Sequence, residues 1–374
     1  MNRFQGKAYM IPSFLKILAL AFLSLLLLSG CATHLPQRWT QRPDEVSIMT
    51  YNVENLFDTA HDKGKDDLSF LPLSLKAQPK HKAECQKITN PRYKEQCLHQ
   101  DWSDSVLEEK MQRLAQVILQ VNNGRGADLV FLQEVENINV LKQLNDKYLK
   151  SAQYKHIVLL EGPDHRGIDT AFLSRLEMTT PPQLHKIPFK GKSAEDQKKM
   201  EQSRSILQAT FRLPTGTPLT AFAIHFPSPG HPSYWRKQAI SHLNYLKSQV
   251  PKDHLVIAGG DFNITAKEDQ KNRLYQKELA EKWLVSHLIG CRQCKGTEFF
   301  SKGQSWSFLD ALLFDKKFQD RQAPWQIDVT SISVAHRVPL QNSSIGTPAR
   351  FDKDNPVGVS DHWPVYARLK SQAP

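Results

Sequence analysis

The stretch Leu255-Val-Ile-Ala-Gly-Gly-Asp-Phe-Asn263 is a short, β-prone apolar run that stops at two glycines and a polar cluster. Such a run, bounded by glycines, predicts a buried strand. Asp261 and Asn263 are two residues apart, so their side chains share one side of an extended chain and Phe262 takes the other. A carboxylate beside a carboxamide can hold a water molecule and take its proton. The other interpretation is an Asx-type turn after a buried strand.

The same pattern recurs four more times along the chain, each time as an apolar run that ends at a polar cluster suited to metal or phosphate. In chain order the four clusters are Asn52 with Glu54 after 46–51, Glu134 after 128–133, His225 after 219–224, and Asp361 with His362 after 358–360. One buried strand that ends in an acid is ordinary. Five such ends predict that several strand ends of one sheet system converge on one site.

The acids among these clusters suit a hard cation. Glu134 follows a very apolar strand, where a carboxylate cannot easily stay unpaired. Mg²⁺ prefers oxygen ligands, usually one or two protein carboxylates with water and substrate phosphate. Asp361 and His362 are adjacent, so their side chains diverge, and one can touch metal while the other faces substrate. The alternatives are an ion pair for Glu134 and a surface-loop pair for Asp361 and His362.

Two further polar residues fit the same site. Asp310 lies inside the apolar run 306–314 and needs a partner there. An Asp beside a His fixes the tautomer of the imidazole and supports its positive charge, so we expect an Asp310–His362 pair. His225, at the end of a strand, is either a structural histidine or a contact to a phosphoryl oxygen.

The charge balance favours a polyanionic substrate or an anionic surface. The chain carries 49 Lys and Arg against 38 Asp and Glu, a formal net charge of +11. Removal of residues 1–30 would take away three basic residues and no acidic ones, which leaves 46 against 38, a net charge of +8. Arg166 and Arg236 are candidate substrate contacts, since a guanidinium group forms bidentate hydrogen bonds with phosphate. A soluble basic protein with ordinary surface arginines is the alternative.

The N-terminus has the form of a bacterial secretory signal. Three basic residues precede an apolar stretch, Ile17–Leu28, that is short for a bilayer span of about 20 residues, although a transmembrane anchor is the alternative. Leu28-Ser-Gly-Cys31 resembles the lipobox of bacterial lipoproteins, which implies cleavage before Cys31 and lipid modification of that residue. Ala32 favours sorting to the outer membrane in that class. Lipid chains would anchor the protein without a membrane span.

Four cysteines remain after Cys31, and an even number in an exported chain indicates disulfides. The local pairings are Cys85–Cys97 and Cys291–Cys294, one of three possible connectivities. A zinc site that uses all four thiolates is the alternative, but the first two cysteines lack the spacing of a zinc knuckle.

The remaining pattern predicts one large domain over 46–374, after a signal at 1–30 and a polar tether at 31–45. The polar segment 59–104 has little periodicity and predicts a surface insertion. A capping box, Ser105 to Glu108, predicts the start of a helix. Further elements are helices over 138–149 and 233–250 and a charged loop over 186–201. Many strands with few helices favour sheets packed on each other with helices outside.

The ordered set of motifs resembles the endonuclease/exonuclease/phosphatase superfamily over nearly the whole mature chain. The motifs are Thr50–Asp58, Leu132–Glu136, Ala223–His225, Gly260–Asn263, Phe308–Asp310 and Ser360–His362. The first of them most resembles bacterial extracellular nuclease-like members. The resemblance implies an α/β fold, a four-layered α-β-β-α sandwich with two central mixed sheets, and a site at the strand ends between them.

The resemblance also implies roles by motif position. The implied metal residues are Asn52, Glu54, Glu134 and Asp361. The implied catalytic residues are His225, Asp261, Asn263, Asp310 and His362. Asp261 would align or deprotonate the attacking water, and His362, oriented by Asp310, would lie on the scissile phosphate. Glu54 stands where many relatives have Asp, and the insertion at 59–104 has no evident counterpart in the smaller nucleases.

These inferences predict an exported, monomeric envelope lipoprotein of the outer membrane, anchored at Cys31, that hydrolyses phosphodiesters with Mg²⁺. Mn²⁺ and Ca²⁺ are the alternative ions. A nuclease, with DNA or RNA as its partner and an endonucleolytic mode of cleavage, is the first expectation. A phosphoinositide phosphatase or sphingomyelinase-like enzyme of the same fold is the alternative. A non-catalytic binding lipoprotein is the third, and the intact set of site residues argues against it.

Overall fold

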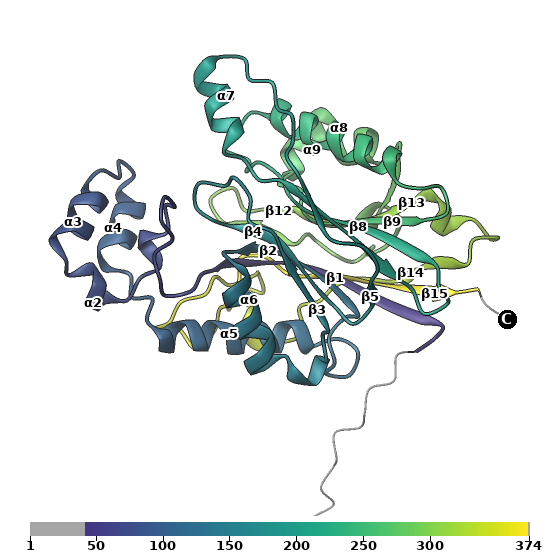
Figure 1. The fold of residues 1–374 in the computed structure, drawn as a ribbon, viewed down its shortest axis with the longest axis horizontal. Helices are drawn as coiled ribbons and strands as arrows, with labels where there is room; N and C mark the ends of the chain where they lie inside the picture. The colour runs from purple at the N-terminus through teal and green to yellow at the C-terminus, as the bar shows by residue number, and fades with distance from the viewer. Residues whose placement is uncertain (1–41, 373–374) are drawn as a thin grey trace, which may run out of the picture. The chain divides into compact units, whose positions relative to one another are not determined.

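Two β-sheets packed on each other form the centre of the fold in the computed structural model, which describes residues 42–372 (Figure 1). The first sheet has six strands in the order β14-β15-β1-β2-β4-β3, and the second has seven, β10-β13-β9-β8-β7-β5 with β6 on β7. In the first sheet the bounds are β1 Glu45–Leu56, β2 Leu129–Val135, β3 His156–Leu159, β4 Asp169–Ser174, β14 Trp325–Val334 and β15 Val365–Ser371. In the second they are β5 Glu177–Met178, β6 Gln183–His185, β7 Ile206–Arg212, β8 Pro218–His225, β9 Leu255–Asp261, β10 Trp283–Val285 and β13 Asp310–Asp315.

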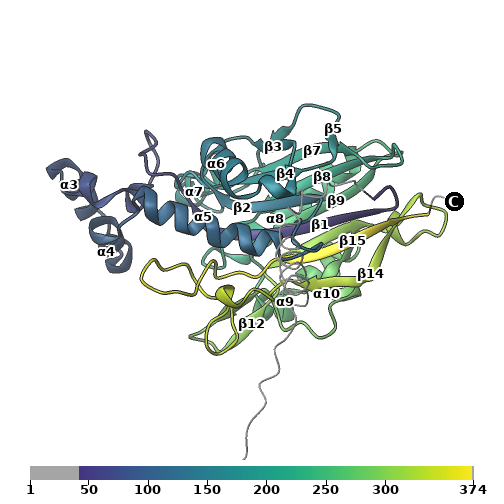
Figure 2. The ribbon, with the colours of Figure 1, turned by 90° about the horizontal axis from the view of Figure 1, so that it is seen from below.

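Both sheets are mixed, because β1 pairs with β2 and β8 pairs with β9 in parallel, whereas their other pairs are antiparallel. Helices cover the outer face of each sheet (Figures 1 and 2). The covering helices are α5 Asp104–Leu119 and α6 Ile138–Tyr148 on the first sheet, and α8 Ser233–Gln249 and the π-helical segment Leu274–Leu279 on the second. Helix α9, Ala266–Asn272, leads into that segment and has no buried residue. This confirms the expected α-β-β-α sandwich. Among residues 42–372, no helix is both long and apolar enough to cross a bilayer.

The layers are held by side chains that alternate along the central strands. In β1, Val46 and Ile48 pack between the two sheets, while Met49 and Tyr51 pack under the helices. This is the two-residue period of a strand that is buried on both faces. Each large apolar side chain buried in this way contributes about 1.5–3 kcal/mol.

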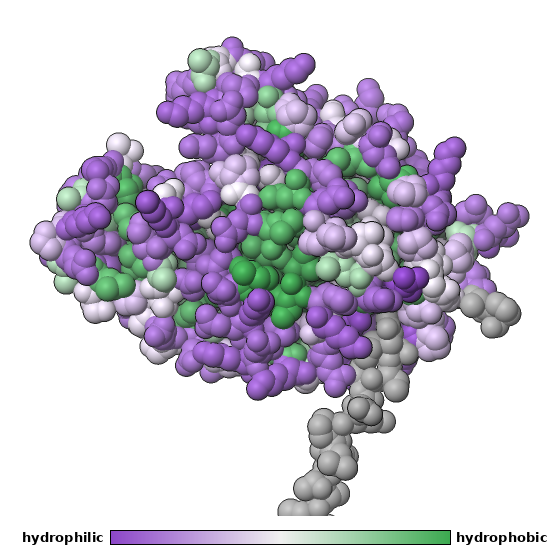
Figure 3. Space-filling model, in the orientation of Figure 1, coloured by the Kyte–Doolittle hydropathy of each residue, from purple (hydrophilic) through white to green (hydrophobic). Residues whose placement is uncertain are grey.

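The core between the sheets reaches the surface at one edge of the sandwich. Figure 3 shows an apolar area over the edge strands in the orientation of Figure 1. Leu160, Met178 and Leu184 are partly buried against this core. A strand hairpin, β11 Glu298–Phe300 with β12 Ser305–Ser307, forms a third, small sheet.

The insertion at 59–104 contains more regular structure than its sequence predicts. It forms a 3-10 helix, Leu68–Phe70, and three short α-helices, α2 Leu73–Lys76, α3 Pro79–Gln86 and α4 Pro91–His99. A disulfide between Cys85 and Cys97 joins the last two, and a second disulfide joins Cys291 and Cys294. The local pairing is therefore confirmed, and it leaves none of these four sulfurs for zinc.

Two local expectations were wrong. Helix α5 begins at Asp104 with Ser103 as its N-cap, so Ser105 and Glu108 form no capping box. Residues 186–201 are not all loop, because α7 spans Ala194–Glu201 and Ser193 accepts a hydrogen bond from the Asp196 amide at its start. Residues 1–41, with the expected signal, Cys31 and most of the expected tether, lie outside the described residues.

Candidate active site

The carboxyl ends of β8 and β9 bring three of the predicted residues side by side. In the parallel pair β8–β9, His225 lies opposite Asp261, and in the antiparallel pair β9–β13, Asp310 also lies opposite Asp261. Asp261 is thus flanked by His225 on one neighbouring strand and by Asp310 on the other. The register of one sheet therefore builds half of the site.

The other half comes from the first sheet and meets Asp261 through Asn52. The Asn52 Nδ2 donates to Asp261 Oδ2 at 3.1 Å and to Glu134 Oε1 at 3.5 Å. Asn52 Oδ1 accepts from the Glu54 amide at 3.0 Å, and Glu134 Oε2 accepts from the Asn55 amide at 3.1 Å. Strand ends from both sheets thus converge, as the sequence predicts.

Left-handed backbone aims several of these side chains. Glu54, Asn55, Glu134 and Asn263 have φ values of 51°, 57°, 65° and 54°. The first three coincide with register shifts at the ends of β1 and β2, where a bulge turns a side chain off the strand's regular direction. Non-glycine residues in this region cost about 1–3 kcal/mol each, and such strain concentrates at functional sites.

Asp261 and Asn263 form a compact pair. The Asn263 amide donates to Asp261 Oδ1 at 2.8 Å, and Asn263 Nδ2 donates to the Phe226 carbonyl at 2.9 Å. The pair thus has the hydrogen bond of an Asx turn and still faces the site. Burial, and then the nearby Asp310 against the opposing effect of His362, raises the pKa of Asp261 to about 7.

Asp310 and His362 are paired as expected. The His362 Nδ1 lies 2.7 Å from Asp310 Oδ2, and both side chains are buried. Burial disfavours the imidazolium, but Asp310 and Asp361 outweigh it and hold the pKa of His362 well above its ordinary value. Oxygens of Asp261 and Asp310 and a ring nitrogen of His362 all lie within 4.8 Å of one another.

His225 has the opposite electrostatic character. Its Nε2 lies 3.6 Å from Asp261 Oδ2 and 3.8 Å from Glu134 Oε1. Burial, and then the charges of Arg204 and Arg166, hold the pKa of His225 well below its ordinary value. The pKa values of the two imidazoles are therefore shifted in opposite directions, which favours the neutral form of His225 and the protonated form of His362.

Glu54 and Asp361 share a cation that the sequence did not suggest. Arg350 places one guanidinium nitrogen on each of the two carboxylates. Burial, and then Asp361 against the opposing effect of Arg350, raises the pKa of Glu54 to about 7. Arg350 stands eleven positions before Asp361 in a polar segment, and no local pattern marks it.

Two arginines, Arg166 and Arg204, lie near His225. The charge of Arg166 acts on His225, as does that of Arg204, which was not predicted. Arg204 pairs with Asp164 at 3.3 Å and donates to the same Phe226 carbonyl as Asn263, which places it beside the strand ends of the candidate site.

The prediction that Arg236 contacts phosphate was wrong. Its side chain is only 3% exposed, and its guanidinium is bonded to both carboxylate oxygens of Glu268 and to the carbonyls of Pro227, Ser228 and His231. Arg236 therefore holds the loop after β8 in place and has no group free for a substrate.

The strand ends offer a donor set that fits a hard divalent cation. The carboxylates of Glu134 and Asp261 both lie next to the Asn52 carboxamide, which turns its Nδ2 toward them. The Oδ1 of Asn52 is a further oxygen donor and accepts from the Glu54 amide. One or two carboxylates with water and substrate oxygens are the usual shell of Mg²⁺. Asp310 Oδ1 and His225 Nδ1 are buried and have no hydrogen-bond partner among residues 42–372, so the centre has polar capacity left for ligands.

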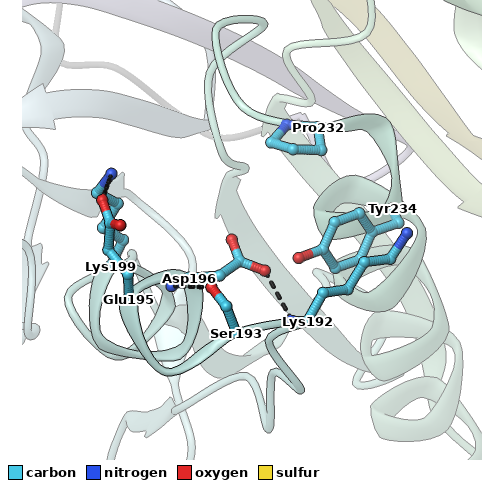
Figure 4. A pocket seen from close by; sticks show the side chains of 7 residues that line it. All are labelled: Lys192, Ser193, Glu195, Asp196, Lys199, Pro232 and Tyr234. Atoms are coloured by element: carbon cyan, nitrogen blue, oxygen red, sulfur yellow. Dashed lines mark hydrogen bonds and ion pairs between the residues drawn. The ribbon is translucent and has the colours of Figure 1, made fainter.

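A separate hollow of about 420 Å³ lies between the starts of α7 and α8 (Figure 4). Lys192 lies along Tyr234 there, with its Nζ 4.5 Å from the ring centroid. The other lining residues are Ser193, Glu195, Asp196, Lys199 and Pro232. None of the strand-end residues lines this hollow, so it is distinct from the site.

Comparison with known proteins agrees with this architecture. The endonuclease/exonuclease/phosphatase family profile matches residues 84–371. No curated protein matches the chain by sequence.

Solved structures share the fold at low sequence identity. A humanised TDP2 of D. rerio is 14% identical with a TM-score of 0.52, covering 87% of this chain and 99% of that one. An endonuclease/exonuclease/phosphatase from Beutenbergia cavernae is 15% identical with a TM-score of 0.52, over 88% and 72%. A mannosyl-6-phosphatase of Bacteroides thetaiotaomicron is 15% identical with a TM-score of 0.51, over 87% and 99%.

Proposed function

The chain belongs to the endonuclease/exonuclease/phosphatase family, and on this premise we propose that it is a divalent-metal-dependent phosphodiesterase that cleaves nucleic acid. The observation that carries the proposal is the position of Asp261 between His225 and the Asp310–His362 pair. A carboxylate base, a neutral imidazole and an imidazolium around one point are the groups that in-line hydrolysis of a phosphodiester needs.

Asp261 is the base in this proposal. A pKa of about 7 suits a general base at neutral pH, because the group is then partly ionised and still takes a proton readily. Asn263 is fixed on the Phe226 carbonyl and orients the water that Asp261 deprotonates. The hydrogen bond from the Asn263 amide to Asp261 Oδ1 holds the Asp261 carboxylate beside Asn263.

His362 stabilises the charge that develops on the phosphoryl group. Asp310 holds the Nδ1 proton, so the Nε2–H points away from Asp310 and can donate to a phosphoryl oxygen. His225, which is neutral, contributes a hydrogen bond without adding charge. Asn52 and Glu134 would hold the divalent cation, which supplies Lewis-acid charge to a phosphoryl oxygen when bound.

Positive charge around the site favours a polyanion. Arg166 and Arg204 lie close enough to His225 to act on its pKa, and without residues 1–30 the chain carries a formal net charge of +8, from 46 Lys and Arg against 38 Asp and Glu. A nucleic acid presents several phosphates, so such charges strengthen its binding on both sides of the scissile bond. Export and a lipid anchor at Cys31, in the outer membrane, are part of the same proposal and rest on the N-terminal sequence alone.

A substrate panel tests the function. The purified protein is incubated with single- and double-stranded DNA, RNA, a phosphoinositide, sphingomyelin and a sugar phosphate, with Mg²⁺, Mn²⁺ or Ca²⁺. We expect cleavage of a nucleic acid that stops on addition of EDTA. Phosphate release from the phosphoinositide or the sugar phosphate without nucleic-acid cleavage would overturn the nuclease. Inertness toward the whole panel would favour a binding protein.

A further inference from the structure

One side chain, that of Arg350, forms ion pairs with both carboxylates of the acidic pair Glu54–Asp361. Arg350 bridges the two carboxylates, with Nη1 on Glu54 Oε1 and Nη2 on Asp361 Oδ2. The amide of the next residue, Phe351, donates to Glu54 Oε2 at 3.2 Å. Glu54 is only 10% exposed and Asp361 is 23% exposed, so the bridge covers two carboxylates that are mostly out of water.

The backbone that carries Arg350 is fixed by the rest of the protein. Segment 349–359 folds back on itself, with the Val359 amide on the Ala349 carbonyl at 2.8 Å. From α5, Arg113 donates to the Gly358 and Asn355 carbonyls at 2.9 and 2.8 Å. The position of Arg350 over the acidic pair is therefore set by a helix of the core.

A second cation, Lys110 of α5, lies near the same acidic pair. Lys110 of α5 is fully buried, donates to the Val359 carbonyl at 2.5 Å, and lies close enough to Glu54 and Asp361 for their charges to act on it. Two carboxylates are thus matched by two cations from the chain itself. Two like charges held together out of water need such compensation, from side chains or from a metal.

Among residues 42–372, no Lys or Arg side chain is bonded to the other oxygen donors of the centre, Asn52 and Glu134. Asn52 and Glu134 contact each other, Asp261 and the Glu54 and Asn55 amides. The Arg350 guanidinium is bonded to the other acidic pair. The donors at Asn52 and Glu134, next to Asp261, are therefore open to a divalent ion, while the Glu54–Asp361 pair already has its counter-charge.

We propose that Arg350 takes the place of a second metal ion, so that this protein holds one divalent cation, at Asn52 and Glu134, and none at Glu54–Asp361. This inference rests on the proposed metal-dependent function and refines it, because it removes Glu54 and Asp361 from the metal residues that the sequence implied. It also predicts that loss of the arginine creates a metal site. The Arg350 side chain is 56% exposed, so its removal opens the acidic pair to ions from solvent.

Counting bound Mn²⁺ tests the proposal without any substrate. Full-length protein, purified in detergent, is titrated with Mn²⁺, and the free ion is measured by electron paramagnetic resonance. We expect one bound ion in the wild type and in Arg350→Lys, and two in Arg350→Met. Arg212→Met is the matched control, because Arg212 pairs with Glu177 on the surface at 3.0 Å, and it should bind one ion.

Two further variants assign the ions to their sites. Glu134→Gln should lose the wild-type ion, and Glu54→Gln combined with Arg350→Met should lose the additional ion and return to one. Two ions in the wild type, or one in Arg350→Met with an unchanged circular dichroism spectrum, would overturn the proposal. The ion counts do not depend on hydrolysis, so a protein that is inert on the substrate panel but shows these counts would contradict the proposed function alone.

Discussion

The imidazole Nδ1 of His362 lies 2.7 Å from Asp310 Oδ2, although the two residues are 52 positions apart in the chain. Asp310 starts β13, and His362 precedes β15 of the other sheet. This bond therefore ties the two sheets together at the site and sets the charge of the imidazole at the same time.

Asp310→Asn should remove that charge. The nearby Asp310 and Asp361 raise the pKa of His362 against the effect of burial, so loss of the Asp310 carboxylate lowers this pKa. The imidazolium then disappears at lower pH, and the alkaline limb of the pH profile of kcat/KM should move to lower pH. The rate at the optimum should fall by roughly 10²–10⁴-fold.

Asp315→Asn is the control for this variant, because Asp315 ends the same strand and pairs with Lys247 at 3.4 Å. Its pH profile should match that of the wild type.

The stability of the fold gives a second readout of the His362 charge. The raised pKa of His362 stabilises the fold below about pH 6.5, the pKa of a free histidine, and this contribution is lost as the pH rises through the folded pKa. An unshifted alkaline limb in Asp310→Asn would contradict the assigned charge.

Asp261→Asn should make the metal-free protein more stable at neutral pH. The folded pKa of Asp261 is about 7, above its unfolded value, so the fold binds a proton that the unfolded chain has released between about pH 4 and pH 7. Stability attributable to Asp261 therefore falls as the pH rises through this window. An amide needs no proton, so the variant should gain of the order of 2–4 kcal/mol at pH 8.

Urea unfolding in EDTA at pH 4 and pH 8 measures this difference. The gain should be present at pH 8 and nearly absent at pH 4, where the aspartic acid is protonated in the fold. An equal gain at both pH values would point to packing and not to ionisation.

Gly260→Ala should damage the pairing of β8 with β9. Gly260 has a φ of 155°, and a Cβ there would lie 1.9 Å from the Ile224 carbonyl oxygen on the neighbouring strand. The strands must separate to admit it, at a cost of about 3 kcal/mol or more. Gly216→Ala is the control, because its φ of 91° is also unusual but no atom lies within 4 Å.

The unfolding free energies of the two glycine variants should therefore differ clearly, with Gly216→Ala losing only about 1 kcal/mol. Gly260→Ala should also lose activity, since the same pairing sets His225 opposite Asp261. Equal losses of stability in the two variants would show that the close approach of the strands is unimportant.

Arg236→Met should destabilise the protein without weakening substrate binding. Arg236 and Glu268 form a buried pair at 2.8 Å, and removal of one partner of such a pair costs about 3–5 kcal/mol. Below the unfolding transition, its KM for nucleic acid should equal that of the wild type. Arg204→Met, at the site, should instead raise KM. A KM that rises in Arg236→Met and not in Arg204→Met would show that Arg236 contacts the substrate phosphate, as the sequence suggested.

The sequence predicts the strand ends because their signal is local. An apolar run that stops at Asp261 or at Glu134 is visible in one segment of the sequence. The two-residue spacing then predicts which side chains lie on the same face of the strand. The Asp310–His362 pair was predictable for a similar reason, since a buried acid requires a partner. The four layers followed from the family resemblance.

What the sequence does not show depends on contacts between distant segments. The left-handed φ of Glu54 and Glu134 arises from register shifts between β1 and β2, which no single segment encodes. Arg204 and Arg350 lie in polar segments that resemble other loops until the fold brings them to the site. The prediction for Arg236 failed because the residue follows His225 closely in the chain, whereas its side chain turns into the interior and pairs with Glu268.

The rate of Mg²⁺-dependent cleavage of DNA and RNA by wild type and Asp261→Asn tests the central claim most directly. The fold of the variant is confirmed first by its unfolding curve, which should show no loss of stability. We predict cleavage of at least one of the two by the wild type and a rate lower by roughly 10²–10⁴-fold in the variant. A variant that cleaves within a few-fold of the wild-type rate would contradict the assignment of Asp261 as the base.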